Sequence, residues 1–246
     1  MDEITEDLLL GGRIRLRQAA RGYRAGLDAG LLAAACDAHP GERVLEAGCG
    51  PGAALLQAAV RRPGALFTGV ERDPAALALA QANIALNGLD ERVAVVAGDV
   101  AQPFARLGLD KFDAVMANPP FFDDPASLRA PSPARRAAWI ADEGLAAWVG
   151  FLLKAVRERG TITLIHRADR LGDILSLLAP KAGSIQVLPI HPFPDAPAKR
   201  VLVRAVKTGR APLKLLQPLV LHARGEPRHL PEVEALLRGE TALGWG

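Results

Sequence analysis

Cysteine is scarce in this 246-residue chain, which contains only Cys36 and Cys49. Two cysteines cannot build the disulfide framework of a small secreted protein, and their spacing is not that of a zinc site. No apolar run approaches the ~20 residues that a membrane span needs. The chain starts M-D-E-I-T-E-D, which is acidic where a secretory signal would be basic. We therefore expect a protein of the reducing cytoplasm, with no metal and no membrane partner.

Aromatic side chains are also few, since tyrosine, tryptophan and phenylalanine together make up 4% of the residues. An appended domain that stacks unpaired bases is therefore not expected. The chain contains neither a G-x-S-x-G elbow nor a P-loop lysine motif. Its five histidines fit no metal or triad spacing. These absences exclude the hydrolase classes that depend on those patterns.

Charge is spread unevenly along the chain, whose formal net charge is +3. Residues 180–246 contain ten lysines and arginines against five acids, and the preceding residues contain twenty against twenty-two. A basic C-terminal third indicates a polyanionic partner, although solvated basic faces are common. The sequence specifies no oligomeric state.

Apolar and helix-forming segments alternate from residue 43 onward, as in an α/β protein, and half of all residues are apolar. We expect a hairpin and loop at 1–27, a main domain at 28–210 and an extension at 211–246 that packs on it. The predicted strands are 43–47, 66–71, 93–97, 112–117, 161–166, 185–190 and 200–207. The predicted helices are 53–61, 74–87, 101–107, 142–158, 169–179 and 231–238.

The N-terminal hairpin is predicted from the segment L-L-L-G-G-R-I-R-L-R-Q, residues 8–18. Gly11 and Gly12 can supply the two positive φ angles of a tight turn. Apolar residues then alternate with arginines, so one face of the second strand is basic. This face is either a solvated edge strand or a contact for RNA.

The stretch V-L-E-A-G-C-G-P-G, residues 44–52, predicts a strand, a tight turn and a helix. Glycine at 48, 50 and 52 permits positive φ and lets a ligand lie against the backbone. The helix that follows offers free N–H groups and a positive dipole end. A plain tight turn would need only one glycine.

The G-x-G-x-G spacing, with Glu46 two residues before the first glycine, resembles the first motif of class I S-adenosylmethionine methyltransferases. This resemblance implies a Rossmann-like α/β fold. Its seven-stranded sheet has helices on both faces and an antiparallel last strand. It also implies that Glu46, Gly48, Gly50 and Gly52 contact the cofactor, S-adenosylmethionine.

Acids follow the next two strands at positions that suit the same cofactor. Glu71, with Arg72 beside it, ends the second strand, where an acid can accept hydrogen bonds from ribose hydroxyls. In this class, the acid corresponding to Asp99 faces the adenine amino group, and Val100 would meet the ring edge. The alternatives are an ordinary exposed acid at Glu71 and a helix cap at Asp99. Three acids would repel a pyrophosphate but suit an ammonium and a sulfonium.

The segment A-N-P-P-F-F follows the fourth strand directly. Two prolines fix a rigid turn and hold Asn118 extended. The Asn118 side-chain oxygen and the Pro119 carbonyl can then accept both hydrogens of one exocyclic amino group. Phe121 offers a face on which a planar group can stack. The alternative is a turn with an aromatic plug. The motif resembles the N/D-P-P-Y/F/W motif of amino-methyltransferases, which implies that Asn118, Pro119, Pro120 and Phe121 form the acceptor site.

The hairpin segment, G-Y-R-A-G-L-D-A, the glycine stretch and N-P-P-F-F together resemble bacterial tRNA adenine-N6 methyltransferases, which modify the adenine beside the anticodon of valine tRNA. The resemblance covers nearly the whole chain. It adds Tyr23 and Asp28 to the cofactor site, although Asp28 also fits the N-cap of a helix over about 28–36.

The acceptor implied is therefore N6 of an adenine in tRNA or another structured RNA. Basic residues near the predicted acceptor site suit phosphates, namely Arg135, Arg136, Lys199 and Arg200, together with Arg129 and Arg204. The alternatives are guanine N2 of ribosomal RNA, a protein glutamine amide and a small molecule. A domain that only binds the cofactor is a further alternative.

Overall fold

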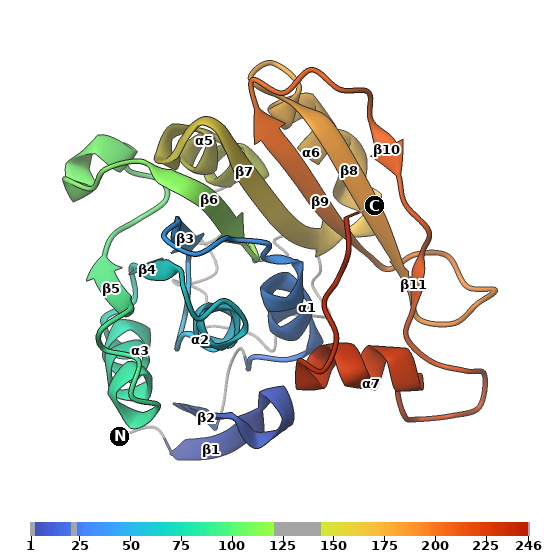
Figure 1. The fold of residues 1–246 in the computed structure, drawn as a ribbon, viewed down its shortest axis with the longest axis horizontal. Coiled ribbons are helices and arrows are strands. Elements are labelled where there is room, and N and C mark those ends of the chain that lie inside the picture. The colour runs from blue at the N-terminus through green and yellow to red at the C-terminus, as the bar shows by residue number, and fades with distance from the viewer. Residues whose placement is uncertain (1–2, 21–23, 121–143, 246) are drawn as a thin grey trace, which may run out of the picture.

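The computed structural model describes residues 3–20, 24–120 and 144–245. Within these ranges the chain forms one nine-stranded sheet with helices on both faces, and a separate two-stranded hairpin (Figure 1). None of the helices in these ranges is long and apolar enough to cross a membrane.

The hairpin consists of β1 (Ile4–Leu9) and β2 (Ile14–Ala19), joined by the 3-10 turn η1 (Leu10–Gly12). The large sheet contains β3 (Arg43–Ala47), β4 (Leu66–Glu71), β5 (Val93–Ala97), β6 (Phe112–Ala117), β7 (Val156–Arg167), β8 (Ala182–His191), β9 (Arg200–Lys207), β10 (Lys214–Leu215) and β11 (Leu219–Val220). The α-helices are α1 (Leu27–Ala35), α2 (Ala53–Arg61), α3 (Pro74–Leu86), α5 (Leu145–Ala155), α6 (Leu171–Leu178) and α7 (Pro231–Arg238). Two further 3-10 turns are η2 (Phe104–Leu107) and η3 (Ala168–Arg170).

The strand order of the large sheet is β5-β4-β3-β6-β7-β9-β8, with β10 and β11 beyond β8. β3 to β7 are parallel, and β9 runs antiparallel to both β7 and β8. The seven-stranded sheet with an antiparallel last strand, as expected from the sequence, is therefore confirmed. The two added strands are two residues long each, and Pro218 lies between them.

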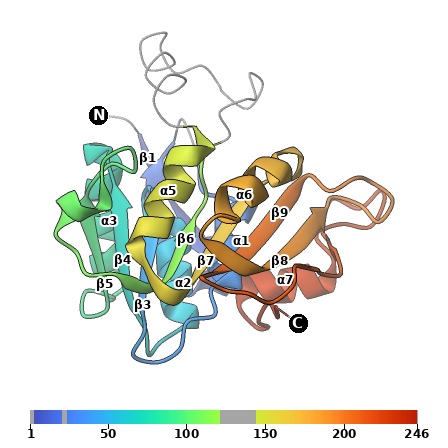
Figure 2. The same ribbon diagram turned by 90° about the horizontal axis from the view of Figure 1, so that it is seen from above.

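Two apolar layers sandwich the sheet because successive residues of each strand point to opposite faces. Val44 packs with α1 and α2, whereas Leu45 packs with α5 and α6. In Figure 1, α5 lies above the sheet and α1, α2 and α7 lie below it. Figure 2 looks onto the α5 and α6 side. Because helices cover both faces of the sheet, the sequences of these strands are nearly continuous apolar runs.

Two local predictions were wrong. The predicted helix 101–107 is only the 3-10 turn η2, because Pro103 lacks an N–H and keeps the residue before it out of the helical region. Asp28 is not an N-cap, since α1 begins one residue earlier and Gly26 occupies that position. The hairpin prediction is confirmed, and Gly11 and Gly12 have φ of 66° and 87°. The turn is longer than the two-residue turn expected, because Leu9 pairs with Ile14, and Leu10 also has a positive φ of 53°.

The two chain ends pack on the α1 side of the main domain. β2 lies against α3, and α7 contacts α1 and η1. Trp245 is buried, and its indole Nε1 donates to the carbonyl oxygen of Ala35 at 3.0 Å. The hairpin and the C-terminal segment are therefore integrated with the α1 side of the sheet.

Candidate active site

Four chain segments meet at the carboxyl edge of the parallel strands. β6, β3, β4 and β5 are neighbours in that order, so the residues that follow them lie along one edge. These are Asn118, the glycine loop (residues 48–52), Glu71 and Asp99. Ala47 and Ala117 are paired in register, so Gly48 and Asn118 follow adjacent positions. The structure thus gathers the central residues that the sequence predicted for one site.

The glycine loop requires its three glycines. Gly48, Gly50 and Gly52 have φ of 64°, 56° and 92°, a region that other residues enter only at a cost. At Gly48 space is also lacking, because a Cβ would lie 2.3 Å from the ring of Trp148 on α5. At Gly50 a Cβ would meet open space. No sequence motif predicts that Trp148 packs on the loop.

Backbone hydrogen bonds and one carboxylate fix the loop to β4. Cys49 N donates to the Val70 carbonyl at 3.1 Å, and Gly50 N donates to Glu71 Oε2 at 2.8 Å. The other Glu71 oxygen accepts from Asp73 N at 2.8 Å. Glu71 is 9% exposed, which excludes the alternative of an ordinary exposed acid. Each oxygen retains a second lone pair, so the carboxylate can hold the loop and still accept from a ligand hydroxyl.

Glu46 is a buried carboxyl group at the end of β3, with 3% of the residue exposed. Burial raises the pKa of Glu46 well above its ordinary value, and the nearby Glu71 charge adds to this, while a Leu55 backbone hydrogen bond opposes it. Its Oε2 has no hydrogen-bond partner among the described residues. A buried carboxyl oxygen in this position suits a ligand that carries positive charge.

Asp99 forms a local turn rather than a helix cap. Its Oδ1 accepts from Ala101 N at 2.8 Å, and its Oδ2 lies 3.9 Å from a guanidinium nitrogen of Arg72. Both side chains are about one third exposed, so a ligand can reach them. The neighbouring Val100 is buried, at 7% exposed.

The acceptor segment continues from β6. Pro119 is buried, and Asn118 and Pro120 are half-buried. Tyr23, Phe121, Arg129, Arg135 and Arg136 lie outside the described residues.

Two residues predicted for different ligands pair with each other. Arg200 Nε lies 3.1 Å from Asp28 Oδ2 in an ion pair whose side chains are 32% and 17% exposed. Arg204 pairs with Asp37 at 2.6 Å and is 18% exposed. Among Lys199, Arg200 and Arg204, which we call the basic cluster, Lys199 is the exposed residue. The ion pairs reduce the positive charge that the cluster offers to a polyanion.

Comparison with known proteins decides the family. Residues 24–130 match the methyltransferase small domain. A tRNA1(Val) (adenine(37)-N6)-methyltransferase of Porphyromonas gingivalis is 30% identical over 207 residues, covering 80% of this chain and 79% of the relative. The chain belongs to this family of S-adenosylmethionine-dependent N-methyltransferases. It is therefore an enzyme, and S-adenosylmethionine is its cofactor.

Two further matches place the methyltransferase among its relatives. A ribosomal protein uL3 glutamine methyltransferase of Bradyrhizobium diazoefficiens is 35% identical over 103 residues, covering 42% of this chain and 31% of that protein. The structure of a predicted O-methyltransferase from Agrobacterium tumefaciens superposes with a TM-score of 0.73 at 27% identity, covering 88% of this chain and 98% of that one. The Agrobacterium structure shares the fold of this chain, and the names of the two matches differ in the acceptor.

The residues of the methyltransferase fit its cofactor. The unpartnered oxygen of Glu46 suits the cofactor's positive charge, and the glycine loop leaves room beside Gly50 for a ligand against the backbone. No group of three or more His, Cys, Asp or Glu residues in the described ranges could hold a metal ion.

Proposed function

We propose that this methyltransferase transfers a methyl group to N6 of an adenine in tRNA, at a site formed by Asn118, Pro119, Pro120 and Phe121. One observation carries the proposal: the N-P-P-F segment begins at Asn118, in register with the start of the glycine loop. The acceptor segment and the cofactor loop thus leave adjacent strands. The Porphyromonas relative, named for adenine in tRNA, supports the choice of acceptor.

The proposed role of Asn118 follows from the chemistry of an exocyclic amino group. Such a nitrogen is a poor nucleophile because its lone pair is delocalised into the ring. When bound, the cofactor supplies an electrophilic methyl group on its sulfonium. The Asn118 side-chain oxygen and the Pro119 carbonyl accept the two amino hydrogens and stabilise the positive charge that forms on nitrogen. The proton produced is acidic and can leave to water, so no strong base is needed.

The proposed cofactor contacts follow the order of the strands. Glu46 faces the charged methionine end, Glu71 receives the ribose hydroxyls, and Asp99 with Val100 meets the adenine. Arg72, Tyr23 and Asp28 complete the proposed set. Glu71 also holds Gly50, so a Glu71→Ala change tests loop and ribose together. Glu71→Gln is the sharper variant, because an amide oxygen can still accept from the Gly50 N–H.

The proposed RNA contacts are Arg135, Arg136, Lys199 and Arg200. The catalytic domain itself holds the tRNA, with a single-stranded base swung out. Arg200 contacts the RNA while it remains in its ion pair with Asp28. A tRNA substrate also places the proposed activity in the cytoplasm. For the chain, we propose a main domain at 28–210 flanked by the hairpin region and the C-terminal extension.

Product analysis tests the acceptor. The protein is incubated with labelled S-adenosylmethionine and, separately, with unmodified valine tRNA, ribosomal RNA and ribosomal proteins. N6-methyladenosine in the tRNA sample is the expected product. A transcript with guanine in place of the adenine beside the anticodon is the matched control and should stay unlabelled. N2-methylguanosine in ribosomal RNA, or N5-methylglutamine in protein, would contradict the proposal and identify the alternative.

A further inference from the structure

Asn83 on α3 is a fully buried polar residue, at 0% exposed, that lies outside every predicted site. Its side-chain Nδ2 donates to the carbonyl oxygen of Arg17 at 2.8 Å and to that of Pro51 at 2.9 Å. Its Oδ1 accepts from the N–H of Arg17 at 2.8 Å. One side chain thus links three parts of the molecule, namely α3, strand β2 and the glycine loop.

Asn87, four residues later, makes the matching contacts to β2, and its side-chain hydrogen bonds go to β2 and to Asn83 rather than to the glycine loop. Its Oδ1 accepts from Arg15 N at 2.9 Å, and its Nδ2 donates to Arg15 O at 2.8 Å and to Asn83 O at 2.7 Å. Four helical residues rise about 6 Å and two strand residues about 6.8 Å, so the two spacings match. The two asparagines therefore pair with β2 as a neighbouring strand would.

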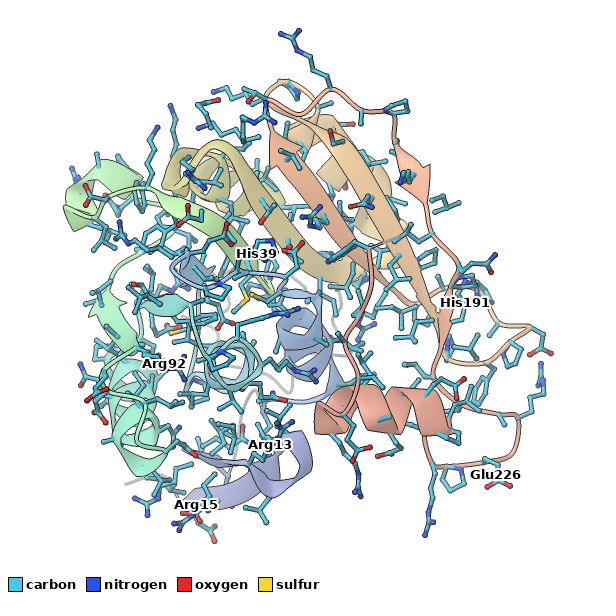
Figure 3. All side chains as sticks on the ribbon, in the orientation of Figure 1. Arg13, Arg15, His39, Arg92, His191 and Glu226 are labelled. Atoms are coloured by element: carbon cyan, nitrogen blue, oxygen red, sulfur yellow. The ribbon has the colours of Figure 1, made fainter. Side chains whose placement is uncertain are left out.

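The pairing places the hairpin beside α3, with Arg15 on its outer side (Figure 3). Asparagine is a poor helix former, and its side chain competes for backbone groups. Asn83 lies inside the alanine- and leucine-rich helix α3, which indicates a tertiary role for it, whereas Asn87 is the C-cap residue of the same helix. For Asn87 this role is to hold the hairpin, and for Asn83 it also includes the loop.

The glycine loop has two kinds of anchor. Val70 and Glu71 hold Cys49 and Gly50, and both belong to β4 of the main sheet. Pro51 is held by the Asn83 side chain, whose other hydrogen bonds go to Arg17 on β2. Pro51 immediately precedes Gly52, the N-cap of α2, so its position sets where the loop meets the helix. The hairpin thereby supports the cofactor site without lying in the sheet.

We propose that Asn83 is a positioning residue for S-adenosylmethionine, because it fixes the glycine loop by tying Pro51 to strand β2 of the hairpin. Asn83 acts through the loop and needs no contact with the cofactor. The proposal concerns cofactor binding and holds for any acceptor. In this arrangement the hairpin belongs functionally to the cofactor site, although more than thirty residues separate Arg17 from Pro51 in the sequence.

The test compares Asn83→Ala with Asn87→Ala in the full-length protein. Both changes remove hydrogen bonds to β2, and only Asn83→Ala frees Pro51. Titration calorimetry with S-adenosylmethionine, run well below both unfolding midpoints, should show about tenfold weaker binding for Asn83→Ala. Binding by Asn87→Ala should stay within about twofold of the original protein. Both unfolding midpoints should fall.

A second pair guards against a variant that does not fold. Asn83→Ser and Asn87→Ser keep a small polar group, which is too short to bridge Arg17 and Pro51. Hydrogen exchange at the amides of Gly50 and Gly52 should be faster in the folded Asn83 variant and unchanged in the Asn87 variant. Equal losses of cofactor affinity in the two members of a pair would overturn the proposal, and so would unchanged affinity in a folded Asn83 variant.

Discussion

The parallel half of the large sheet, β5 to β6, has acids at its carboxyl edge, whereas the charged residues of β7 and β9 are mostly arginine and lysine. In the first half, Glu46 is buried and its Oε2 has no hydrogen-bond partner among the described residues. The carboxylate of Glu71 accepts hydrogen bonds from two backbone N–H groups, those of Gly50 and Asp73. In the second half, the cations pair with acids, as in Arg200 with Asp28, Arg204 with Asp37 and Lys207 with Glu158.

The difference shows that a formal charge count does not locate a binding surface. The C-terminal third is basic in sequence, yet the acids Asp28 and Asp37 come from α1 and the residues after it. Partners distant in sequence therefore offset part of the charge of the basic segment, and this cannot be read from local composition. A ligand site is better indicated by charge that the protein leaves without a partner.

The largest effect is expected from Asn118→Ala, at the edge of the acidic half. If Asn118 stabilises the charged amino group in the transition state, its loss should reduce kcat by ~100-fold or more while cofactor affinity stays nearly unchanged. Single-turnover methyl transfer to RNA, with cofactor binding measured separately, gives both values. Methylation at the original rate would show that the N-P-P-F segment has another role.

Next in size is the effect of Gly48→Ala. The new Cβ meets the Trp148 ring and the residue must keep a positive φ, so we expect unfolding free energy to fall by ~2–4 kcal/mol. Gly50→Ala is the matched control, with a similar φ and open space, and should cost only ~1–2 kcal/mol. Urea unfolding measures both. Equal costs would mean that contact with Trp148 does not restrict the loop.

Glu46 should lower the free energy of unfolding at high pH, because it is a buried carboxyl group with one unpartnered oxygen. Because its pKa is raised in the folded protein, its stabilising contribution is present below the ordinary value near 4.5 and is lost as pH rises above it. As pH rises from 5 to 8, the protein without cofactor should therefore lose stability relative to Glu46→Gln. Parallel stability curves for the two proteins across this range would refute the assignment.

The smallest effect is expected from Lys199→Ala in the basic half. If Lys199 contacts a phosphate as proposed, its removal should weaken tRNA binding about threefold and lower the salt slope by about one. Arg204→Ala should leave that slope unchanged and reduce stability by ~1–3 kcal/mol, because it breaks an ion pair that is largely shielded. Filter binding and urea unfolding separate the two. A changed slope in Arg204→Ala would mean that the pair with Asp37 opens to RNA.

Sequence periodicity predicted most of the large sheet because each strand is covered on both faces. The boundaries of β3, β4, β5, β6 and β9 match the prediction. The strands β10 and β11 were missed, since two-residue segments carry no periodic signal. The start of β7 at Val156 was missed as well, because Arg159 takes a φ of 62° and interrupts the alternation.

The site was predictable where one local segment carries the chemistry, as at Glu46 and the glycines. It was not predictable where function depends on a packing partner. Trp148 and Asn83 are separated in sequence from the glycine loop, and neither belongs to a motif with a known ligand. The double use of Glu71, as loop anchor and proposed ribose partner, also depends on the distance to Gly50.

The two short strands beside β8 have a consequence for solubility. β8 is ten residues long, and Ile185, Val187 and Ile190 are buried in it. Left uncovered, its row of backbone N–H and C=O groups would be a template for a strand of another molecule. β10 and β11 occupy that row in two pieces, and Pro218 between them cannot donate a backbone hydrogen bond. Removing residues 211–221 should therefore promote aggregation through β8 even where the rest of the sheet still folds.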